Sequence, residues 1–472
     1  MRTFQDLEAV QNDPAAKTAF VQSFIAEHAT SASVRTAEKA DKYDKQLNTG
    51  VDDFLDALAD IDYKLNGIKK RARPETVKSN SFHRLNVQRV AYSLANGITL
   101  PDADEVKAHL GENFDEQLYR LGYLACIHGE SFGFWNNDHL DVFKLTEFAP
   151  LYDEKDGTMR AGIRFWRLQP DKPMHAVLYE ESGYTRYTES GKGEHQLQQD
   201  GEQQPYKTTT TTTPAGDEIV EGEGYGTLPI VPLWGSSAKQ STLVNLKGYI
   251  DNTDLIVNGF CDDLRECAQV YWLISNYGGM QDDDLRKFMQ RLRFNHAANV
   301  DNAGTNGGSV QPYTQEIPTQ ARENLLQRLH SSMYEDFGGL DVHCVSANST
   351  NDHLEAAYQP LDENARDFEQ QITKLVRQVL KIAGLPDAKP QYTHVRISNT
   401  KEQVDMTLAE AAIIGNEMAI ELLPNLTTEQ KEQAKAALMA ESATRETVDE
   451  DDEDGEDDED EEDKEDESTH QE

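Results

Sequence analysis

The order of elements from Ser241 to Gly384 constrains the fold of this chain more than any other feature of its sequence. A long amphipathic helix begins at Ser241, a residue type that caps helix N-termini well. An insertion with strand and helix patterns follows, and a second helix runs from Thr319 to Phe337. A polar loop then leads to a third helix, which is predicted to begin after Pro360. Two helices joined at their far end by an insertion, followed by a loop and a long helix, are typical of a ring subunit built around a channel.

The first of these helices has one apolar face and one acidic face. The apolar residues, at the spacing of a single helix face, are Leu243, Leu246, Ile250, Val257, Phe260 and Leu264. The opposite face carries Asp251, Asp254 and Asp262, and these carboxylates are candidates to line a channel. The third helix has a seven-residue apolar repeat from Ala365 to Ile382, which indicates ordinary helix packing more often than a coiled coil.

The insertion between the first two helices combines two predicted strands, Tyr271 to Ile274 and Ser309 to Ile317, with a short helix from Asp282 to Phe294. The basic residues of this helix are Arg286, Lys287, Arg291 and Arg293. They form the one basic cluster that the sequence shows in an acidic chain. Three interpretations stay open: a docking point for acidic partner surfaces, contact with DNA phosphates, and a solvated face that balances the charges of Asp282 to Asp284.

The region before Ser241 changes from helical to β patterns. Residues 1 to 132 are predicted to be largely helical, and residues 134 to 187 are predicted to form strands. Residues 188 to 226 include six consecutive threonines, Thr208 to Thr213, and are predicted to form an exposed hairpin or a mobile loop. The whole chain is therefore predicted to be α+β and mainly helical.

Two further helices, Gln403 to Leu423 and Thr428 to Met439, are predicted to precede an acidic tail. From Glu446 to Glu472 the tail holds 19 acidic residues and one lysine, a net charge of −18. Such a run cannot bury a core, so the tail is predicted to be disordered. The whole chain carries −40, which leaves −22 for the remaining residues. A body of this charge will not grip DNA by counterion release, because that mechanism needs clustered lysine and arginine.

No signal for secretion or membrane insertion is evident. The first ten residues are polar, and no apolar run reaches the ~20 residues that a membrane-spanning helix needs. The cysteines show neither metal-ligand spacing nor the density of a disulfide framework: Cys126, Cys261, Cys267 and Cys344. Reduced thiols and synthesis in a cytoplasm are predicted.

The one apparent catalytic motif is the G-x-S-x-G pattern from Gly129 to Gly133, with Ser131 at its centre. In hydrolases this motif joins a strand to a following helix, which exposes the serine on a strained turn. Here a helical pattern precedes the motif and a β pattern follows it, which favours a glycine-rich turn. A serine hydrolase that uses Ser131 stays as an alternative. The chain has no phosphate-binding loop of an ATPase and no H-E-x-x-H motif, so no enzymatic activity, cofactor or metal is predicted.

A series of short motifs follows a recognisable order. They are Asn86–Gly97 with Tyr92, Gly129–Gly133, Pro150–Asp153, Ala161–Phe165, Leu228–Leu233, Phe337–Gly339 and Tyr358–Asp362. Each motif is weak alone, but their order over residues 40 to 440 resembles that of the portal proteins of long-tailed bacteriophages.

This resemblance implies a subunit with wing, stem, clip and crown regions. The implied regions are a wing region at 1–237, a first stem helix at 238–265, a clip at 266–317, a second stem helix at 318–337, a tunnel loop at 338–357, a long wing helix with a following strand at 358–400, crown helices at 401–444 and the tail at 445–472. The implied DNA-facing residues of the tunnel loop are Ser346, Asn348, Ser349, Thr350 and Asn351. The basic cluster then lies in the clip, where it would dock partners.

The resemblance also implies a structural role in the virion. Portal proteins form a dodecameric ring at one capsid vertex, through which double-stranded DNA is packaged and ejected without sequence specificity. The implied partners are the terminase packaging motor, head–tail adaptor proteins, and the major capsid and scaffolding proteins, with no membrane involved. The protein would be made in the host bacterial cytoplasm. Acidic walls would repel phosphates and keep DNA centred. The principal alternative is an acidic-tailed, chaperone-like binding protein.

Overall fold

The computed structural model divides the chain into two compact units. One unit comprises Met1–Asp341 with Gln359–Val395, and the other comprises Val342–Tyr358 with Arg396–Glu472. The residues described are 2–57, 76–101, 104–190, 196–212, 218–267, 271–275, 283, 286–287, 290, 309–313, 318–345, 350–394, 396, 400–423 and 430–439. The acidic tail that is predicted to be disordered lies outside these residues.

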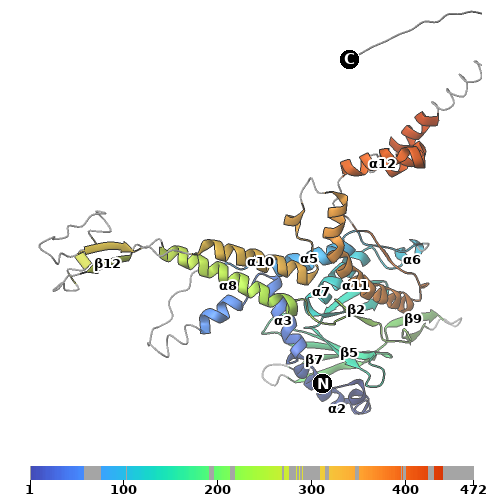
Figure 1. The fold of residues 1–472 in the computed structure, drawn as a ribbon. Helices are drawn as coiled ribbons and strands as arrows, with labels where there is room; N and C mark the ends of the chain where they lie inside the picture. The colour runs from blue at the N-terminus through green and yellow to red at the C-terminus, as the bar shows by residue number, and fades with distance from the viewer. Residues whose placement is uncertain are drawn as a thin grey trace, which may run out of the picture. The chain divides into compact units, whose positions relative to one another are not determined.

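Helices and strands both contribute to the fold, which confirms the α+β class (Figure 1). The helices are α1 (Phe4–Glu8), α2 (Pro14–Ala29), α3 (Ala32–Asp44), α5 (Ser81–Leu94), α6 (Asp104–Ala108), α7 (Phe114–His128), α8 (Leu243–Cys267), α10 (Thr319–Phe337), η1 (Val342–Cys344), α11 (Asn351–Ala383), α12 (Thr400–Ile414) and α13 (Asn416–Leu422). The strands are β1 (Ile98–Thr99), β2 (Glu130–Asn136), β3 (His139–Lys144), β4 (Phe148–Tyr152), β5 (Met159–Trp166), β6 (His175–Glu180), β7 (Gly183–Glu189), β8 (Leu197–Gln204), β9 (Lys207–Thr212), β10 (Glu218–Glu223), β11 (Ile230–Trp234), β12 (Tyr271–Ser275), β13 (Ser309–Tyr313) and β14 (Gln391–Tyr392).

Two antiparallel sheets lie at the centre of the larger unit. One has the strand order β4-β5-β6-β7-β8, and the other has the order β11-β2-β3. One face of the five-stranded sheet packs against α2, where Phe24 and Ile163 share a core. Its other face packs against the three-stranded sheet, where the rings of Phe132 and Phe148 lie 4.4 Å apart. Strands β4 and β6 of the five-stranded sheet are therefore buried on both faces, whereas the edge strand β8 is exposed at every residue except Leu197.

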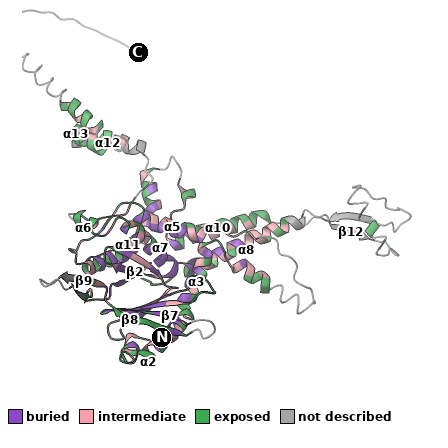
Figure 2. Ribbon diagram, turned by 180° about the vertical axis from the view of Figure 1, so that it is seen from behind, coloured by how far each residue is buried: buried purple, intermediate pink, exposed green. Residues whose placement is uncertain are grey.

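Helices α7 and α11 contribute to a second core with the three-stranded sheet. This core contains Leu121 of α7, Trp135 of β2 and Phe368 of α11. Gly122 permits the contact between the two helices, because a Cβ at this position would meet the Phe368 ring at 2.7 Å. Buried residues concentrate in β2 and in the helices around it (Figure 2). The layer order is α2, the five-stranded sheet, the three-stranded sheet, and α7 with α11.

Most predicted elements before the stem are confirmed. The β pattern of 134–187 corresponds to strands β2 to β7. The hairpin interpretation of 188–226 is also confirmed, because β9 pairs with β10 from Lys207 opposite Glu223 to Thr212 opposite Glu218. Five of the six consecutive threonines lie in β9.

Two predicted helices differ from the structure. Helix α11 begins at Asn351 and contains Pro360, so the prediction that it starts after this proline is wrong. A proline inside a helix costs about 3 kcal/mol, but the turns before it bury Leu354 and Tyr358, each of which contributes about 1.5–3 kcal/mol. The single helix predicted from Gln403 to Leu423 is divided into α12 and α13 by Gly415, whose φ is 88°.

His28 makes part of the stability pH-dependent. It is 1% exposed, and its Nε2 lies 2.8 Å from the carbonyl of Leu145. Burial lowers the pKa of His28, while the bond to this carbonyl acts in the opposite direction. The unfolded chain therefore takes up a proton near pH 6.5 while the folded chain does not, so stability falls as pH drops below this value.

Replacing His28 with glutamine is expected to flatten the pH dependence of stability between pH 7 and 5. One such proton contributes at most about 1.4 kcal/mol per pH unit. The measurement is the thermal midpoint at several pH values, with His139→Gln as the control because His139 is exposed. Parallel curves for the wild type and His28→Gln would contradict the assignment.

Candidate functional site

Helices α8 and α10 lie side by side as an antiparallel pair, which we name the stem hairpin (Figure 1). Near its base, the Tyr249 hydroxyl of α8 donates to Asp336 of α10. Near its far end, Arg322 pairs with Asp263 and lies 5.4 Å from the centroid of the Phe260 ring. Strands β12 and β13, which pair antiparallel, continue the chain beyond this end. Helix α8, strands β12 and β13 and helix α10 therefore follow one another in the predicted order, while most residues of the short helix predicted between the strands, Asp282 to Phe294, lie outside the described residues.

A cluster of buried and half-buried side chains with polar groups fixes the base of α8. This root cluster comprises Tyr43, Asn48, Ser79, Asp251 and Asp254. Asn48 Nδ2 donates to Asp254 Oδ2 over 2.6 Å, and the backbone N–H of Ser79 donates to Asp254 Oδ1 over 2.8 Å. The Tyr43 hydroxyl donates to Asp251. The two carboxylates thus hold α8 against segments that lie far from it in the sequence.

The expectation that Asp254 lines a channel is wrong. Asp254 is 2% exposed, and burial raises its pKa although its two hydrogen bonds act in the opposite direction. A desolvated carboxylate that accepts two hydrogen bonds from protein is a structural anchor. Asp251 is half-buried and is engaged by Tyr43 and Lys247. Asp262 is exposed and stays a candidate for the channel wall.

Side chains from α5 and α11 hold the C-terminal end of α10. Gly338 ends this helix with a left-handed φ of 68°, as predicted. Gln88 donates to the carbonyl of Leu340 over 2.9 Å and accepts from the N–H of the same residue over 3.0 Å. Asn364 donates to the carbonyl of Phe337 over 2.6 Å. These bonds satisfy backbone groups that a helix end leaves unpaired.

Part of the predicted tunnel loop falls within the residues described. Ser346, Asn348 and Ser349 lie outside them. Thr350 precedes α11, and its hydroxyl accepts a backbone hydrogen bond from the first turn over 3.4 Å, as a helix cap does. Asn351 is the first residue of α11. The loop is therefore shorter than the predicted range of 338–357, and contact with DNA stays a prediction.

Only part of the basic cluster of the clip lies within the described residues. Arg286 and Lys287 are helical and exposed, whereas Arg291 and Arg293 lie outside the residues described. Exposure of the first two permits docking, but it is equally compatible with a solvated face.

The G-x-S-x-G segment is a turn from helix to strand. Helix α7 ends at His128, Gly129 has a φ of 89°, and β2 begins at Glu130. Ser131 is 0% exposed, and its hydroxyl donates to the carbonyl of Leu121 over 2.8 Å. A buried hydroxyl bonded in this way cannot attack a substrate, so the serine hydrolase alternative is wrong.

Sequence reasoning missed the residues that hold the stem. Asn48, Ser79, Gln88 and Asn364 each bond to groups distant in the sequence, and no local spacing marks them.

In the part of the chain that the structure describes, no three His, Cys, Asp or Glu side chains are grouped to hold a metal ion. None of the helices described there is both long enough and apolar enough to cross a bilayer.

The sequence matches a known protein family over most of its length. The family model for phage portal proteins of the SPP1 Gp6-like type matches residues 34–446. The chain therefore belongs to the phage portal protein family, which makes it a structural component of the virion.

Individual relatives are more distant. The portal protein of Bacillus phage SPP1 is 25% identical over 395 residues, which cover 76% of this chain and 75% of that protein. The portal protein of Clostridium phage phiCD119 is 27% identical over 206 residues, which cover 42% of this chain and 45% of that protein. The match thus spans less than half the length of the Clostridium phage protein. A chain from the neck of an empty GTA particle, computed with C6 symmetry, is 12% identical with a TM-score of 0.42, and the match covers 74% of this chain and 91% of that one.

Proposed function

We propose that this protein forms the dodecameric ring at one vertex of a phage capsid, through which double-stranded DNA is packaged and ejected. The stem hairpin is the observation that carries this proposal. Its two helices are bonded to each other near both ends, and the root cluster joins its base to Tyr43, Asn48 and Ser79. Repeated around an axis, such hairpins would form the wall of a channel.

The charge of the stem suits a wall along which DNA slides. Among the described residues, the exposed positions of α8 hold no basic residue and those of α10 hold one, Arg328. Each contact between a basic side chain and a phosphate strengthens binding in a salt-dependent way. A wall with few basic residues therefore lets DNA advance without being held. Asp262, exposed on α8, would repel phosphates, and Thr350 and Asn351 would face the DNA at the tunnel loop.

The work of packaging is assigned to a separate motor. The sequence has no phosphate-binding loop, so a terminase ATPase would drive the DNA while this ring guides it. Further partners would be head–tail adaptor proteins and the major capsid and scaffolding proteins.

Electron microscopy of the purified protein in negative stain tests the ring directly. Rings with a central hole are expected. A protein that stays monomeric at micromolar concentration in moderate salt would overturn the proposal. A monomer that captures basic proteins would instead support the alternative of an acidic chaperone.

The clip is proposed as the docking point for the motor and adaptors. The double variant Arg286→Glu/Arg291→Glu is expected to form normal rings, while packaging or adaptor binding falls and becomes more sensitive to salt. Motor-dependent DNA packaging and adaptor pull-down at two salt concentrations measure this. Lys155→Glu/Lys172→Glu makes the same change of charge at exposed positions in the connections between β4, β5 and β6 and is the control. Unchanged packaging and adaptor binding would remove the docking role.

A further inference from the structure

The exposed face of α11 carries a second basic cluster. The exposed residues from 366 to 381 are Arg366, Gln370, Lys374, Arg377, Gln378 and Lys381. The acidic residues of this stretch turn to other partners. Asp367 accepts from the N–H of Ser237 over 3.0 Å, and Glu369 lies 2.5 Å from the His394 ring nitrogen. The face is therefore basic and amide-bearing, with no exposed acid over about four helix turns. We name it the basic stripe.

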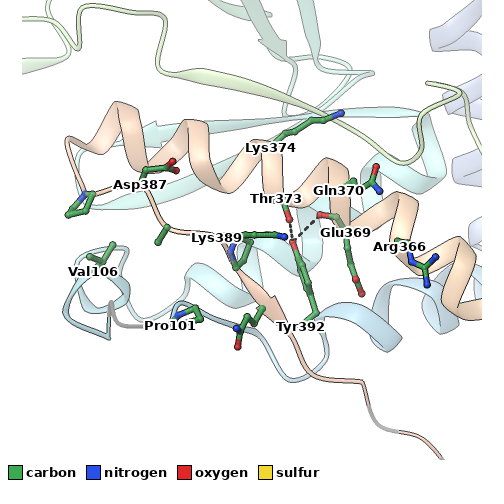
Figure 3. A pocket seen from close by; sticks show the side chains of 14 residues that line it. Pro101, Val106, Arg366, Glu369, Gln370, Thr373, Lys374, Asp387, Lys389 and Tyr392 are labelled. Carbon is green, nitrogen blue, oxygen red and sulfur yellow. Dashed lines mark hydrogen bonds between the residues drawn. The ribbon is translucent and has the colours of Figure 1, made fainter.

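The basic stripe borders a hollow of about 950 Å³ (Figure 3). Helix α11 lies on one side of the hollow, and Pro101 and Val106 lie on the opposite side. Tyr392 is fixed inside it, because its hydroxyl lies 2.9 Å from the Thr373 hydroxyl and 3.1 Å from the Glu369 carbonyl. A second hollow of about 710 Å³ continues along α11 and shares some of the same residues. Together they form a groove with one basic wall and one apolar wall.

The positive charge of this groove is only partly neutralised. Five basic and two acidic side chains line the two hollows. Of the acids, Asp387 pairs with Arg377 and Glu369 faces a histidine. Within the part of the chain that the structure describes, Arg366, Lys381 and Lys389 have no acidic side chain at ion-pair distance. The whole chain carries −40, so a positively charged groove on its surface is an exception that calls for an acidic partner.

We infer that this groove docks an acidic segment of a second copy of the chain. The inference rests on the proposed ring, in which every subunit meets a neighbour of the same sequence. A neighbour with 85 acidic and 45 basic residues supplies carboxylates to the basic stripe. The apolar wall argues against DNA as the occupant, since a duplex would bring phosphates to the stripe but no side chains to cover Pro101 and Val106. A polypeptide segment that alternates acidic and apolar side chains fits both walls.

The groove is formed before any partner arrives. The segment after α11 carries Pro386 and Pro390, whose fixed φ angles limit its movement, and Tyr392 is bonded on two sides. This segment therefore loses little conformational freedom when a partner binds, which favours affinity. Single exposed ion pairs contribute little binding free energy, so we expect the basic stripe to set the register and orientation of the neighbour. The apolar wall would supply the apolar surface that is buried on association.

Crosslinking at Ala388 tests the occupant. Ala388 lines the hollow and is half-buried. Ala388→p-benzoylphenylalanine is incorporated into full-length protein, and rings are assembled from equal amounts of 14N and 15N subunits. Illumination is expected to yield heavy–light products whose partner peptide is rich in Asp and Glu. Rings that form but yield no heavy–light product would overturn the interface alone, whereas wild-type protein that never forms rings would overturn the proposed function as well.

Charge reversal supplies an independent test. The double variant Arg366→Glu/Lys374→Glu is expected to raise the subunit concentration needed for half assembly about tenfold or more, because like charges then face each other. Lys155→Glu/Lys172→Glu carries the same change outside the groove and is expected to assemble as the wild type does. Equal assembly of both double variants would overturn the interface. So would binding of a DNA duplex that is lost in Arg366→Glu/Lys374→Glu while assembly is unchanged.

Discussion

Asp254→Ala is expected to increase local opening at the base of α8 about 100-fold. The substitution leaves the Asn48 amide and the Ser79 N–H without their charged acceptor in a buried place. Two such losses together cost about 3 kcal/mol, which corresponds to about a 100-fold change in the opening equilibrium. Hydrogen exchange at the Ser79 amide, followed by mass spectrometry, measures this directly, because its protection depends on the bond to Asp254.

Asp262→Ala is the matched control for this prediction. Asp262 lies two turns further along the same helix and is exposed, so its loss is expected to change stability by less than about 0.5 kcal/mol. Equal exchange at Ser79 in Asp254→Ala and Asp262→Ala would show that Asp254 is not an anchor.

Gly129→Ala is expected to lower the thermal midpoint by roughly 4 °C, the equivalent of about 3 kcal/mol for a unit as large as the one that contains this turn. The left-handed conformation of Gly129 disfavours a side chain by about 1–2 kcal/mol. A Cβ would also lie 2.8 Å from the backbone nitrogen of Ser241, which must then move. That movement strains the bond from the Ser241 hydroxyl to the Ile127 carbonyl and the 3.1 Å bond from the Thr242 N–H to the Cys126 carbonyl.

Gly157→Ala separates the backbone effect from the steric one. Gly157 also has a positive φ, of 67°, but no other group lies within 4 Å of the position that a Cβ would take there. This variant is expected to lose only the conformational part, about 1–2 kcal/mol. Equal midpoints for Gly129→Ala and Gly157→Ala would contradict the claim that the turn after α7 supports the start of the stem.

The sequence predicts elements well where local signals mark both ends. Helix α10 has the predicted bounds, because Pro318 stands before it and Gly338 ends it. Strands β12 and β13 begin at the predicted residues, Tyr271 and Ser309, and the structure shows in addition that they pair antiparallel. At Pro360 the same kind of signal is misleading, since the buried residues before it keep the helix continuous.

The site residues depend on contacts that no local pattern contains. The period of α8 places Asp254 on the apolar face, because it follows the buried Ile250 by four residues, so the assignment of Asp254 to the opposite face is wrong. Its hydrogen-bond partners, Asn48 and Ser79, lie more than 170 residues away in the sequence. The basic stripe was missed for a related reason. Its successive basic members are three to eight residues apart in sequence, with Asp367 and Glu369 between the first two, so only the exposed face of the folded helix separates the two signs of charge.

The stem hairpin has a consequence for how such proteins diversify. Because Arg322 pairs with Asp263, the chain leaves α8 and enters α10 at nearly the same place. The two ends of the intervening segment therefore lie close together. Doubling the length of this segment would raise the entropic cost of closing the loop by only about 0.6 kcal/mol. A lineage can replace this segment, and with it the surface that the proposed ring would offer to its partners, while the stem hairpin is inherited unchanged.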